Sequence, residues 1–292
     1  MTLNQQTEQG FVLIPVLWIL GMLAVALSTA SLFTTNSMAT ISLVHGRVQA
    51  EALVRAGVES AVYRIRTSSN GLALEGHERV LLTNAYADVS WASEAGRLDI
   101  NLAPGDLISS LLVRMGAEPR DADVIAANIV DRRRQGPVQQ SAIRPVNMTP
   151  FRHFRELAGL GIPDSLLIRI KPFLTVYSGT AKIDPRVASI DVLASLPGLT
   201  EARMRGLADL RIARSSDPNS WVEEAAEAAS YLQFAPSKVM RLRIDGRGNA
   251  GSRRLAEIVA ILFSDDREPY RILDWDYVES NRDFTPLDTL GP

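Results

Sequence analysis

The sequence contains no cysteine and only three histidines, and neither residue type suggests a reactive or metal-binding site. The missing cysteine excludes disulfides, thiolate metal sites and a cysteine nucleophile. The histidines, His45, His77 and His153, do not have the spacing of metal ligands. No Ser-His-Asp order, phosphate-binding loop with a lysine or His-Glu-x-x-His helix stands out either, so the sequence supports no catalytic mechanism.

Charge is also absent near the N-terminus, where no Asp, Glu, Lys or Arg occurs from Gln9 to Gly46. The most apolar part, residues 11–27, would form a helix of about 25 Å, at the short end of what crosses a bilayer. It has no polar face, which argues against a helix of a soluble core. The preceding residues lack the basic start of a secretory signal. A cleavage site at Ala30 still keeps a signal peptide open beside a membrane anchor.

The pattern that follows predicts one long helix and then strands. Apolar residues recur every three or four positions over residues 37–66, which extends the first helix as an amphipathic one. Turn residues at 67–71 end it. Alternating runs on both sides of residues 93–96 (SEAG) predict a hairpin. Three further strands are predicted at residues 239–244, 254–263 and 270–275, and the region between, about residues 103–235, has a helical pattern.

This helical region contains a weak internal repeat. The segments that begin at Ile100 (INLAPGDLISSLL) and Ile183 (IDPRVASIDVLASLPG) align when Ala103 is placed on Ala188. The alignment brings Asp106 and Asp191 together in the first turn of a helix, where a carboxylate suits the helix dipole. A duplication and two independently capped helices explain the pattern equally well.

Residues 196–214 (LPGLTEARMRGLADLRIAR) resemble a helix-hairpin-helix unit. Its tight turn would consist of Leu196, Pro197, Gly198 and Leu199, and the residues expected to face the partner helix are Ala202, Leu207 and Leu210. In nucleic-acid-binding units the turn amides face a phosphate, and nearby basic side chains add charge. Here Glu201 follows the turn and the net charge of the chain is −2, so a compact packing unit is favoured over a DNA-binding site.

The N-terminal segment resembles a type IV prepilin or pseudopilin, because a short polar leader ends in Gly10 and is followed by Phe11 and an uncharged helix. The resemblance implies that prepilin peptidase cuts between these two residues and that the helix is kept, first as a membrane anchor and then in a filament core. Most members carry a glutamate five residues past the cut, where this chain has Pro15. The K-type minor pseudopilin of type II secretion systems lacks this glutamate and is thought to lie at the filament tip.

The rest of the chain is similar to K-type pseudopilins in the order of its segments. Residues 146–160 (VNMTPFRHFRELAGL), the later LTVYSGTAKID and SLPGL carry this similarity. It implies an α+β, type IV pilin-like fold with a long N-terminal helix, a small antiparallel sheet and a large all-α insertion that contains the helix-hairpin-helix-like unit. The implied divisions are a leader (1–10), a spine helix (11–68) with a transmembrane half (11–30), a β region (69–102 and 236–292) and the inserted helical domain (103–235).

The resemblance implies a non-enzymatic minor pseudopilin in the bacterial inner membrane, single-pass, with a periplasmic C-terminal domain. It would start pseudopilus assembly at the tip and support protein export across the outer membrane. The expected partners are the minor pseudopilins I and J, the prepilin peptidase and, before assembly, the inner membrane; nucleic acid is not expected. Some members bind calcium in the insertion, but three arginines follow Asp131 here, so no cofactor is expected.

Two other function classes stay open from the sequence. One is a membrane-anchored helix-hairpin-helix protein for DNA binding and uptake. The other is an unrelated single-span periplasmic protein with a helical binding module. The strands after residue 235 and the lack of a basic excess favour the pseudopilin over both.

Overall fold

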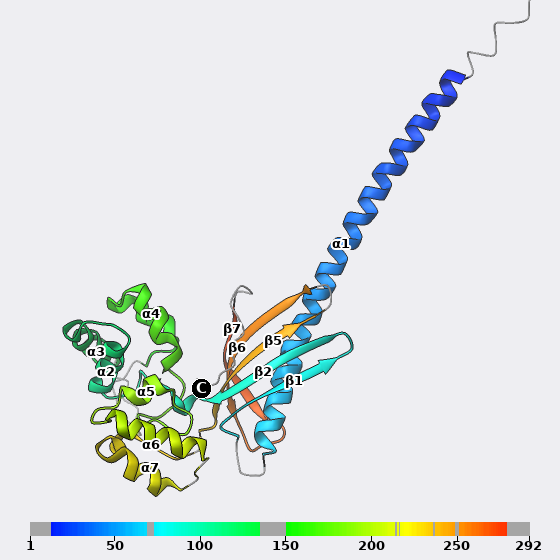
Figure 1. Cartoon of the computed structure of the whole chain (residues 1–292). Coiled ribbons are helices and arrows are strands. Elements are labelled where there is room, and N and C mark those ends of the chain that lie inside the picture. Colours follow the sequence, from blue (N-terminus) through cyan, green and yellow to red (C-terminus); the bar gives the residue numbers. More distant parts are fainter. Residues whose placement is uncertain are drawn as a thin grey trace, which may run out of the picture.

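The computed structural model describes residues 13–68, 73–134, 150–213, 215, 217–235, 237–248 and 251–278. A long helix projects from a head that consists of a sheet and a group of short helices (Figure 1). The helices are α1 (Leu13–Arg66), α2 (Gly105–Arg114), α3 (Pro119–Arg134), α4 (Asp164–Ile170), α5 (Ile190–Ala194), α6 (Glu201–Ile212) and α7 (Pro218–Ala225). The strands are β1 (Glu75–Leu82), β2 (Ala85–Ser93), β3 (Leu98–Asp99), β4 (Leu174–Thr175), β5 (Val239–Arg247), β6 (Arg253–Leu262) and β7 (Tyr270–Val278). The short 3-10 helices are η1 (Glu94–Gly96), η2 (Phe154–Leu160), η3 (Lys171–Phe173) and η4 (Ala226–Tyr231).

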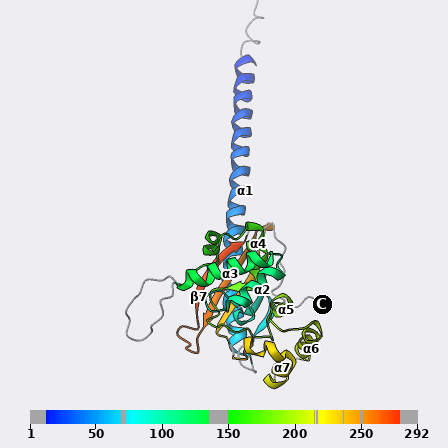
Figure 2. The ribbon, with the colours of Figure 1, turned by 90° about the vertical axis from the view of Figure 1, so that its left-hand side faces the viewer.

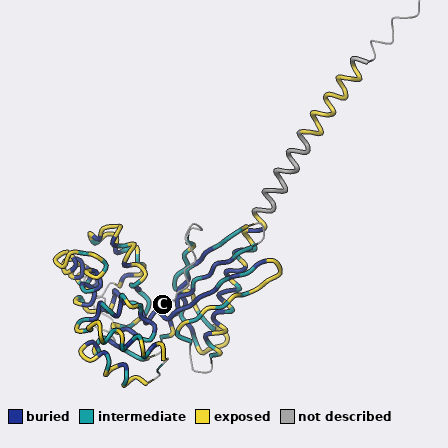
Figure 3. The backbone as a smooth tube through the Cα atoms, viewed as in Figure 1, coloured by how far each residue is buried: buried dark blue, intermediate teal, exposed yellow. Residues whose placement is uncertain are grey.

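Helix α1 has two parts with different surroundings. Its 54 residues correspond to about 81 Å of helix. The C-terminal part packs against one face of the sheet, while the N-terminal part stands free (Figure 3). The helix residues buried against the sheet are Leu53, Val54, Val58, Ala61, Val62 and Ile65. Burial of each large apolar side chain contributes about 1.5–3 kcal/mol, so this stripe attaches the spine to the sheet.

The main sheet is antiparallel, with the strand order β1-β2-β5-β6-β7. Strands β2 and β5 are neighbours in register, with Ser93 opposite Met240, although more than a hundred residues separate them in the chain. The intervening residues form a helical unit, residues 98–231, with its own buried core. Seen from the side of this unit, its helices lie in front of the sheet and α1 rises above both (Figure 2).

The predicted spine and the three C-terminal strands are present, but the predicted hairpin around residues 93–96 is wrong. Those residues form η1, and the hairpin is instead β1 and β2, which turn at Asn84 with a φ of 61°. The second half of the predicted hairpin is β3, a two-residue strand that pairs in parallel with β4 inside the helical unit. The reason is Glu94, which is fully buried where the chain leaves the sheet.

The contact between α1 and the sheet depends on missing side chains at two glycines. A Cβ atom at Gly57 would lie 2.9 Å from Cγ2 of Ile244, and one at Gly246 would lie 2.6 Å from the backbone oxygen of Ala50. The second contact is the stricter one, because a backbone oxygen in a helix cannot turn away as the end of a side chain can.

We expect Gly246→Ala to separate α1 from β5 and to destabilise the head by about 1–3 kcal/mol, as overpacking does in other cores. The measurement is the thermal unfolding of the detergent-solubilised chain by circular dichroism. Gly159→Ala is the matched control, since nothing lies within 4 Å of a Cβ atom there. Equal melting temperatures for the two variants would contradict this account of the helix–sheet contact.

Candidate functional site

The N-terminal part of α1 presents an apolar surface with no cover. Every described side chain from Pro15 to Ser28 is exposed, and Trp18 is 72% exposed. A continuous apolar surface of this kind marks a contact with another apolar surface. None of the helices in the described part of the chain meets the length and hydropathy needed for a membrane span. Gly10 and Phe11, the predicted cleavage site, lie outside the described residues, so that assignment stays a prediction.

Pro15 lies in the first turn of α1, which begins at Leu13 in the described part of the chain. The N–H groups of a first helical turn have no acceptor within the helix. Proline has no N–H to donate and its fixed φ suits a first helical turn, so it is tolerated there. Pro15 adds an uncharged ring to the exposed apolar surface of α1.

Residues 196–199 form a tight turn between α5 and α6. Leu196 is buried, the amide of Leu199 donates to its carbonyl oxygen at 3.3 Å, and Gly198 has a φ of 78°. Thr200 caps α6 by accepting a hydrogen bond from the backbone amide of Arg203. Of the residues predicted to face the partner helix, Leu207 is buried and Leu210 partly buried, whereas Ala202 is exposed. The prediction for Ala202 was therefore wrong, because the start of α6 points this residue to solvent.

A carboxylate occupies the space beside this turn. A Cβ atom at Gly198 would lie 2.9 Å from Oε2 of Glu227. In a nucleic-acid-binding hairpin the amides of the turn face a phosphate. Glu227 would repel a phosphate approaching Gly198 from this side, so the local electrostatics do not favour DNA.

The arginines near the turn are used within the protein. Arg203 donates to the backbone oxygens of Glu223 and Glu224 at 3.2 and 2.9 Å. Arg205 pairs with Glu201 at 2.7 Å, one helical turn away. Arg211 is buried, with 8% of its surface exposed, and Arg214 lies outside the described residues. The hairpin is thus a packing unit in which Arg203 and Arg211 donate to backbone oxygens.

The internal repeat extends to matching hydrogen bonds. Asp99 and Asp184 occupy aligned positions, 85 residues apart like Ala103 and Ala188. The amide of Ala103 donates to the backbone oxygen of Asp99 at 2.7 Å, and that of Ala188 donates to Asp184 at 3.0 Å. The carboxylate of each aspartate also accepts from the amide two residues further on, at 2.9 and 3.0 Å. Both segments therefore form the same aspartate-closed turn before a helix.

A buried arginine completes both copies. Arg133 on α3 donates to the backbone oxygens of Ile100 and of the aligned alanine, at 2.9 and 2.8 Å. Arg211 on α6 donates to the two equivalent oxygens, those of Pro185 and of the second aligned alanine. Arg133 follows its alanine by 30 residues and Arg211 by 23, and each still reaches the equivalent pair of oxygens in its own copy.

The first copy also contains a hairpin that the sequence analysis missed. Helices α2 and α3 are joined through Gly116, which has a φ of 93°, as α5 and α6 are joined through Gly198. The signal was a glycine before the short segment AEP, which lacks the proline-glycine pair of the second turn. Independent capping explains two similar helix starts, but it does not explain matching buried arginines. We infer that the helical unit contains a duplicated element.

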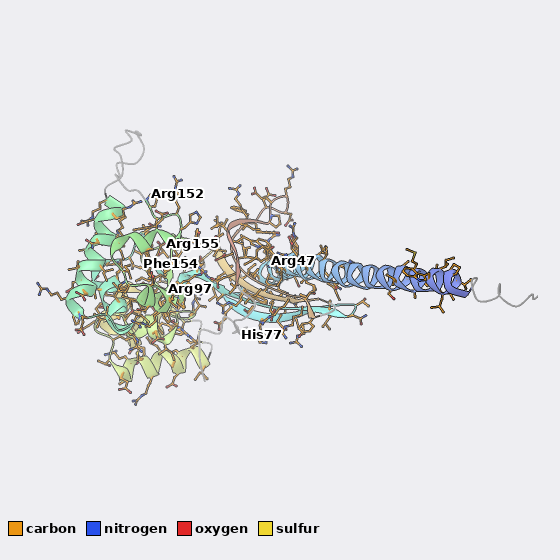
Figure 4. The ribbon with its side chains drawn as sticks, turned by 90° about the horizontal axis from the view of Figure 1, so that it is seen from above. Arg47, His77, Arg97, Arg152, Phe154 and Arg155 are labelled. Carbon is orange, nitrogen blue, oxygen red and sulfur yellow. The ribbon has the colours of Figure 1, made fainter. Side chains whose placement is uncertain are left out.

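The helical unit meets the sheet at a buried ionic cluster around Glu94. Arg241 on β5 donates from Nε to Oε1 of Glu94 at 2.7 Å and from Nη2 to Oε2 at 3.0 Å. Thr175 of β4 donates its hydroxyl to the same carboxylate, and Arg97 lies 3.3 Å from it. Arg241 also pairs with Glu257 on β6. Figure 4 shows Arg97 between the helical unit and the sheet.

Burial and pairing with an opposite charge shift the pKa values of these groups in opposite directions. Burial is the largest effect on Glu94 and would raise its pKa, but the charges of Arg241 and Arg97 with the hydrogen bonds from Arg241 and Thr175 lower it overall. The pKa of Glu257 falls to about 2, because Arg241 and Arg243 outweigh its burial. Burial and the neighbouring Arg241 lower the pKa of Arg97 to about 10. All these carboxylates therefore stay ionised at neutral pH.

None of the residues in this cluster was predicted as a group from the sequence. Arg241 and Arg243 alternate along a predicted strand, which places them on one face, and that pattern was a usable signal. The buried partner of Arg241, Glu94, lies in the SEAG segment, which has the composition of a turn. Further contacts join the helical unit to β7: Arg155 lies 3.6 Å from Asp276, and burial with the neighbouring Asp274 raises the pKa of Tyr177 to about 12.

Within the described residues, no three His, Asp or Glu side chains gather closely enough to hold a metal ion. Asp131 lies on α3 ahead of its three arginines. The acidic segment SDDRE forms the turn between β6 and β7, where Asp266 pairs with Arg66 at 2.7 Å. Two of the acidic residues in this turn therefore have arginine partners, because Glu268 also pairs with Arg271 at 2.8 Å.

Comparison with known proteins gives a likeness in structure. No protein-family model matches the chain, and no curated protein matches it. Among solved structures, the chain is similar to a chain of the GspK-GspI-GspJ complex of the type 2 secretion system of enterotoxigenic Escherichia coli. The TM-score is 0.55 at 12% identity, and the match covers 85% of this chain and 99% of that one. This likeness confirms the predicted α+β, type IV pilin-like fold.

We expect Glu94→Gln to destabilise the protein by about 3–5 kcal/mol at pH 7, because it leaves Arg241 buried with an incomplete partner. The pKa values of Glu94 and Glu257 are lowered on folding, so their stabilisation is complete above the ordinary value of 4.5. It is lost as the pH falls toward about 2. The variant should therefore lose less stability than the parent over this interval.

The measurement is urea unfolding of the detergent-solubilised chain at several pH values. Glu51→Gln is the matched control, since Glu51 pairs with Arg55 on the exposed side of α1 and such pairs contribute about 0–1 kcal/mol. If both variants unfold at the same urea concentration, the buried cluster does not hold the helical unit to the sheet.

Proposed function

We propose that this chain is a non-enzymatic minor pseudopilin of a type II secretion system, of the K type. In this role it lies at the tip of the periplasmic pseudopilus, starts its assembly and supports protein export across the outer membrane. The observation that carries the proposal is the insertion of residues 98–231 between two adjacent strands of a pilin-like head on a long spine helix. The apolar surface of α1 provides the matching means of attachment.

The chemistry of Pro15 supports the place at the tip. A subunit in the shaft would bury its N-terminal end beside that of a neighbour, where an ammonium group needs a carboxylate as partner. A tip subunit has no further subunit beyond it whose amine its carboxylate would pair with. An uncharged residue at position 15 therefore avoids burying a charge that would have no partner.

The size of the helical unit supports the same place. The unit lies to one side of the sheet, away from the axis of α1 (Figures 1 and 2). It would crowd a subunit stacked above or below in the shaft, whereas the end of a filament leaves room for it. A missing charge and a large head are independent features, and both fit an end position.

The proposed partners follow from this role. They are the minor pseudopilins I and J, the prepilin peptidase and, before assembly, the bacterial inner membrane, which a single pass of residues 11–30 would cross to leave the C-terminal domain in the periplasm. The DNA-uptake alternative finds no support, because Glu227 stands beside the hairpin turn and the nearby described arginines are engaged. We propose no cofactor for this function.

We expect prepilin peptidase to remove residues 1–10 and to leave Phe11, N-methylated, as the first residue. Gly10→Leu should block the cut, because a bulky side chain would not fit where the enzyme accepts glycine, whereas Gln9→Ala should be processed normally. Mass spectrometry of the mature N-terminus, with and without the peptidase, checks both. A mature chain that begins near Ser31 would instead mean an ordinary signal peptide, and the pseudopilin proposal would fail.

We expect Pro15→Glu, even when overproduced, to leave pseudopili few and short. The substitution restores the carboxylate, but the helical unit still obstructs stacking. The measurement is filament length by electron microscopy, with immunogold counts of the variant along the shaft and Pro15→Ala as the control. Normal filaments that contain many copies of the variant would show that the head is no obstacle, and the tip assignment would then be wrong.

A further inference from the structure

A groove lies beside the turn of the first hairpin, between α3 and the segment that leads into α4. These two helices lie at the same end of the helical unit (Figure 1). The groove has a volume of about 610 Å³ and is called the hairpin groove below. The wall opposite α3 is formed by residues between Leu160 and Arg169. The α3 wall is one face of that helix, because its residues follow one another at steps of one, three or four: Glu118, Asp121, Val124, Ile125 and Asn128.

In the second copy of the repeat, a helix covers the equivalent face. When the two buried arginines are aligned, Ile125 falls on Arg203 and Asn128 falls on Gly206. Arg203 donates to two backbone oxygens in the last turn of α7. A Cβ atom at Gly206 would overlap with the side chain of Glu224 on the same helix. Helix α7 therefore covers the face of α6 that corresponds to the α3 wall of the hairpin groove.

In the first copy the corresponding face is only partly covered. The 3-10 helix η2 lies against α3, but the hairpin groove stays open beside it. Val124 in the α3 wall is 56% exposed, whereas Ile125 and Leu166 are buried and form an apolar floor. The wall from Glu118 to Asn128 is about 15 Å long, and the eight residues of α7 correspond to about 12 Å. The groove therefore has the length that a second short helix needs.

Three charged side chains lie at the end of the groove next to the hairpin turn. Glu118 directly precedes α3 and Asp121 is in its first turn, and both are exposed. Nη2 of Arg169 lies 3.6 Å from the place that a Cβ atom would take at Gly116. Within the part of the chain that the structure describes, none of these three side chains has a hydrogen bond or an ion pair. This end of the groove thus offers two carboxylates and one guanidinium to another molecule.

We propose that the hairpin groove binds a short amphipathic helix of another protein, as α7 is bound by the second copy. The apolar face of the incoming helix packs on Val124 and Leu166. Its C-terminal turn lies at the hairpin turn, where Arg169 donates to its last carbonyl groups, which have no donor within a helix. Lysine or arginine side chains of that turn meet Glu118 and Asp121, and basic residues also suit the negative end of a helix dipole. The binding does not depend on the secretion role.

The test uses two synthetic peptides derived from α7. One has the sequence of residues 217–226 (DPNSWVEEAA), and in the other both glutamates are replaced by lysine (DPNSWVKKAA). Glutamate and lysine have similar helix propensities, so the peptides differ mainly in charge. We expect the lysine peptide to bind the detergent-solubilised full-length chain about tenfold more tightly, because two repulsive contacts become attractive. The measurement is the fluorescence anisotropy of dye-labelled peptide. Equal affinities, or no binding of the lysine peptide, would overturn the proposal.

A substitution in the groove shows where the peptide binds. We expect Val124→Gln to weaken binding of the lysine peptide severalfold, because it makes the α3 wall polar. Ile212→Gln is the control, since Ile212 is 77% exposed on α6, away from the groove. Unchanged binding to the Val124→Gln chain would mean that the peptide binds elsewhere, for example on the apolar part of α1, and the groove would be ruled out.

The two carboxylates have their own test in the same assay. We expect Glu118→Gln combined with Asp121→Asn to remove the preference for the lysine peptide over the glutamate peptide. The matched control is Glu201→Gln combined with Asp209→Asn, which removes the same charge from exposed positions on α6. If the control pair removes the preference equally well, the preference comes from the overall charge of the chain, and the assignment of Glu118 and Asp121 is wrong.

Discussion

A buried carboxylate must have a positive partner, and in this protein that requirement determines where the chain leaves the sheet and where it returns. Glu94 is the first residue after β2, and Arg241 on β5 supplies two of its hydrogen bonds. Arg241 also pairs with Glu257 on β6, so the cluster joins three strands of the sheet region to the start of the helical unit. The pairing therefore aligns β2 with β5, and it brings β4 of the helical unit to the same point through Thr175.

The helical unit has a second, internal order that does not depend on the sheet. Arg133 and Arg211 each close one copy of the repeat by binding backbone oxygens of the segment before its first helix. Such bonds satisfy carbonyl groups that a buried loop would otherwise leave without donors. A buried guanidinium reaches two oxygens at once, which a lysine could not do with the same geometry.

A large part of the fold could be predicted from local patterns in the sequence. The apolar periodicity of the spine and the alternation of the three C-terminal strands depend only on near neighbours, and both predictions are confirmed. The segment around Glu94 was assigned wrongly because its conformation depends on Arg241, which is 147 positions away in the chain. Strand β1 was missed because its charged residues hide the alternation, as is common for an edge strand. Of the candidate site, the turn at Gly198 was predictable from its residues, whereas its neighbour Glu227 comes from another helix.

The adjacent residues Ile183 and Asp184 have a consequence for the order of folding. The amide of Asp184 donates to the oxygen of Ala95 at 2.8 Å, and the oxygen of Ile183 accepts from the amide of Gln233 at 2.9 Å. One dipeptide thus holds the entrance and the exit of the helical unit side by side. Pairing β2 with β5 closes a very long loop, and the entropy lost in closing a loop grows with its length. Once the helical unit has formed, its two ends lie side by side, and only a short gap remains to be closed between β2 and β5. The fastest folding route therefore forms the helical unit first and the sheet last, because long-range contacts are slow to form.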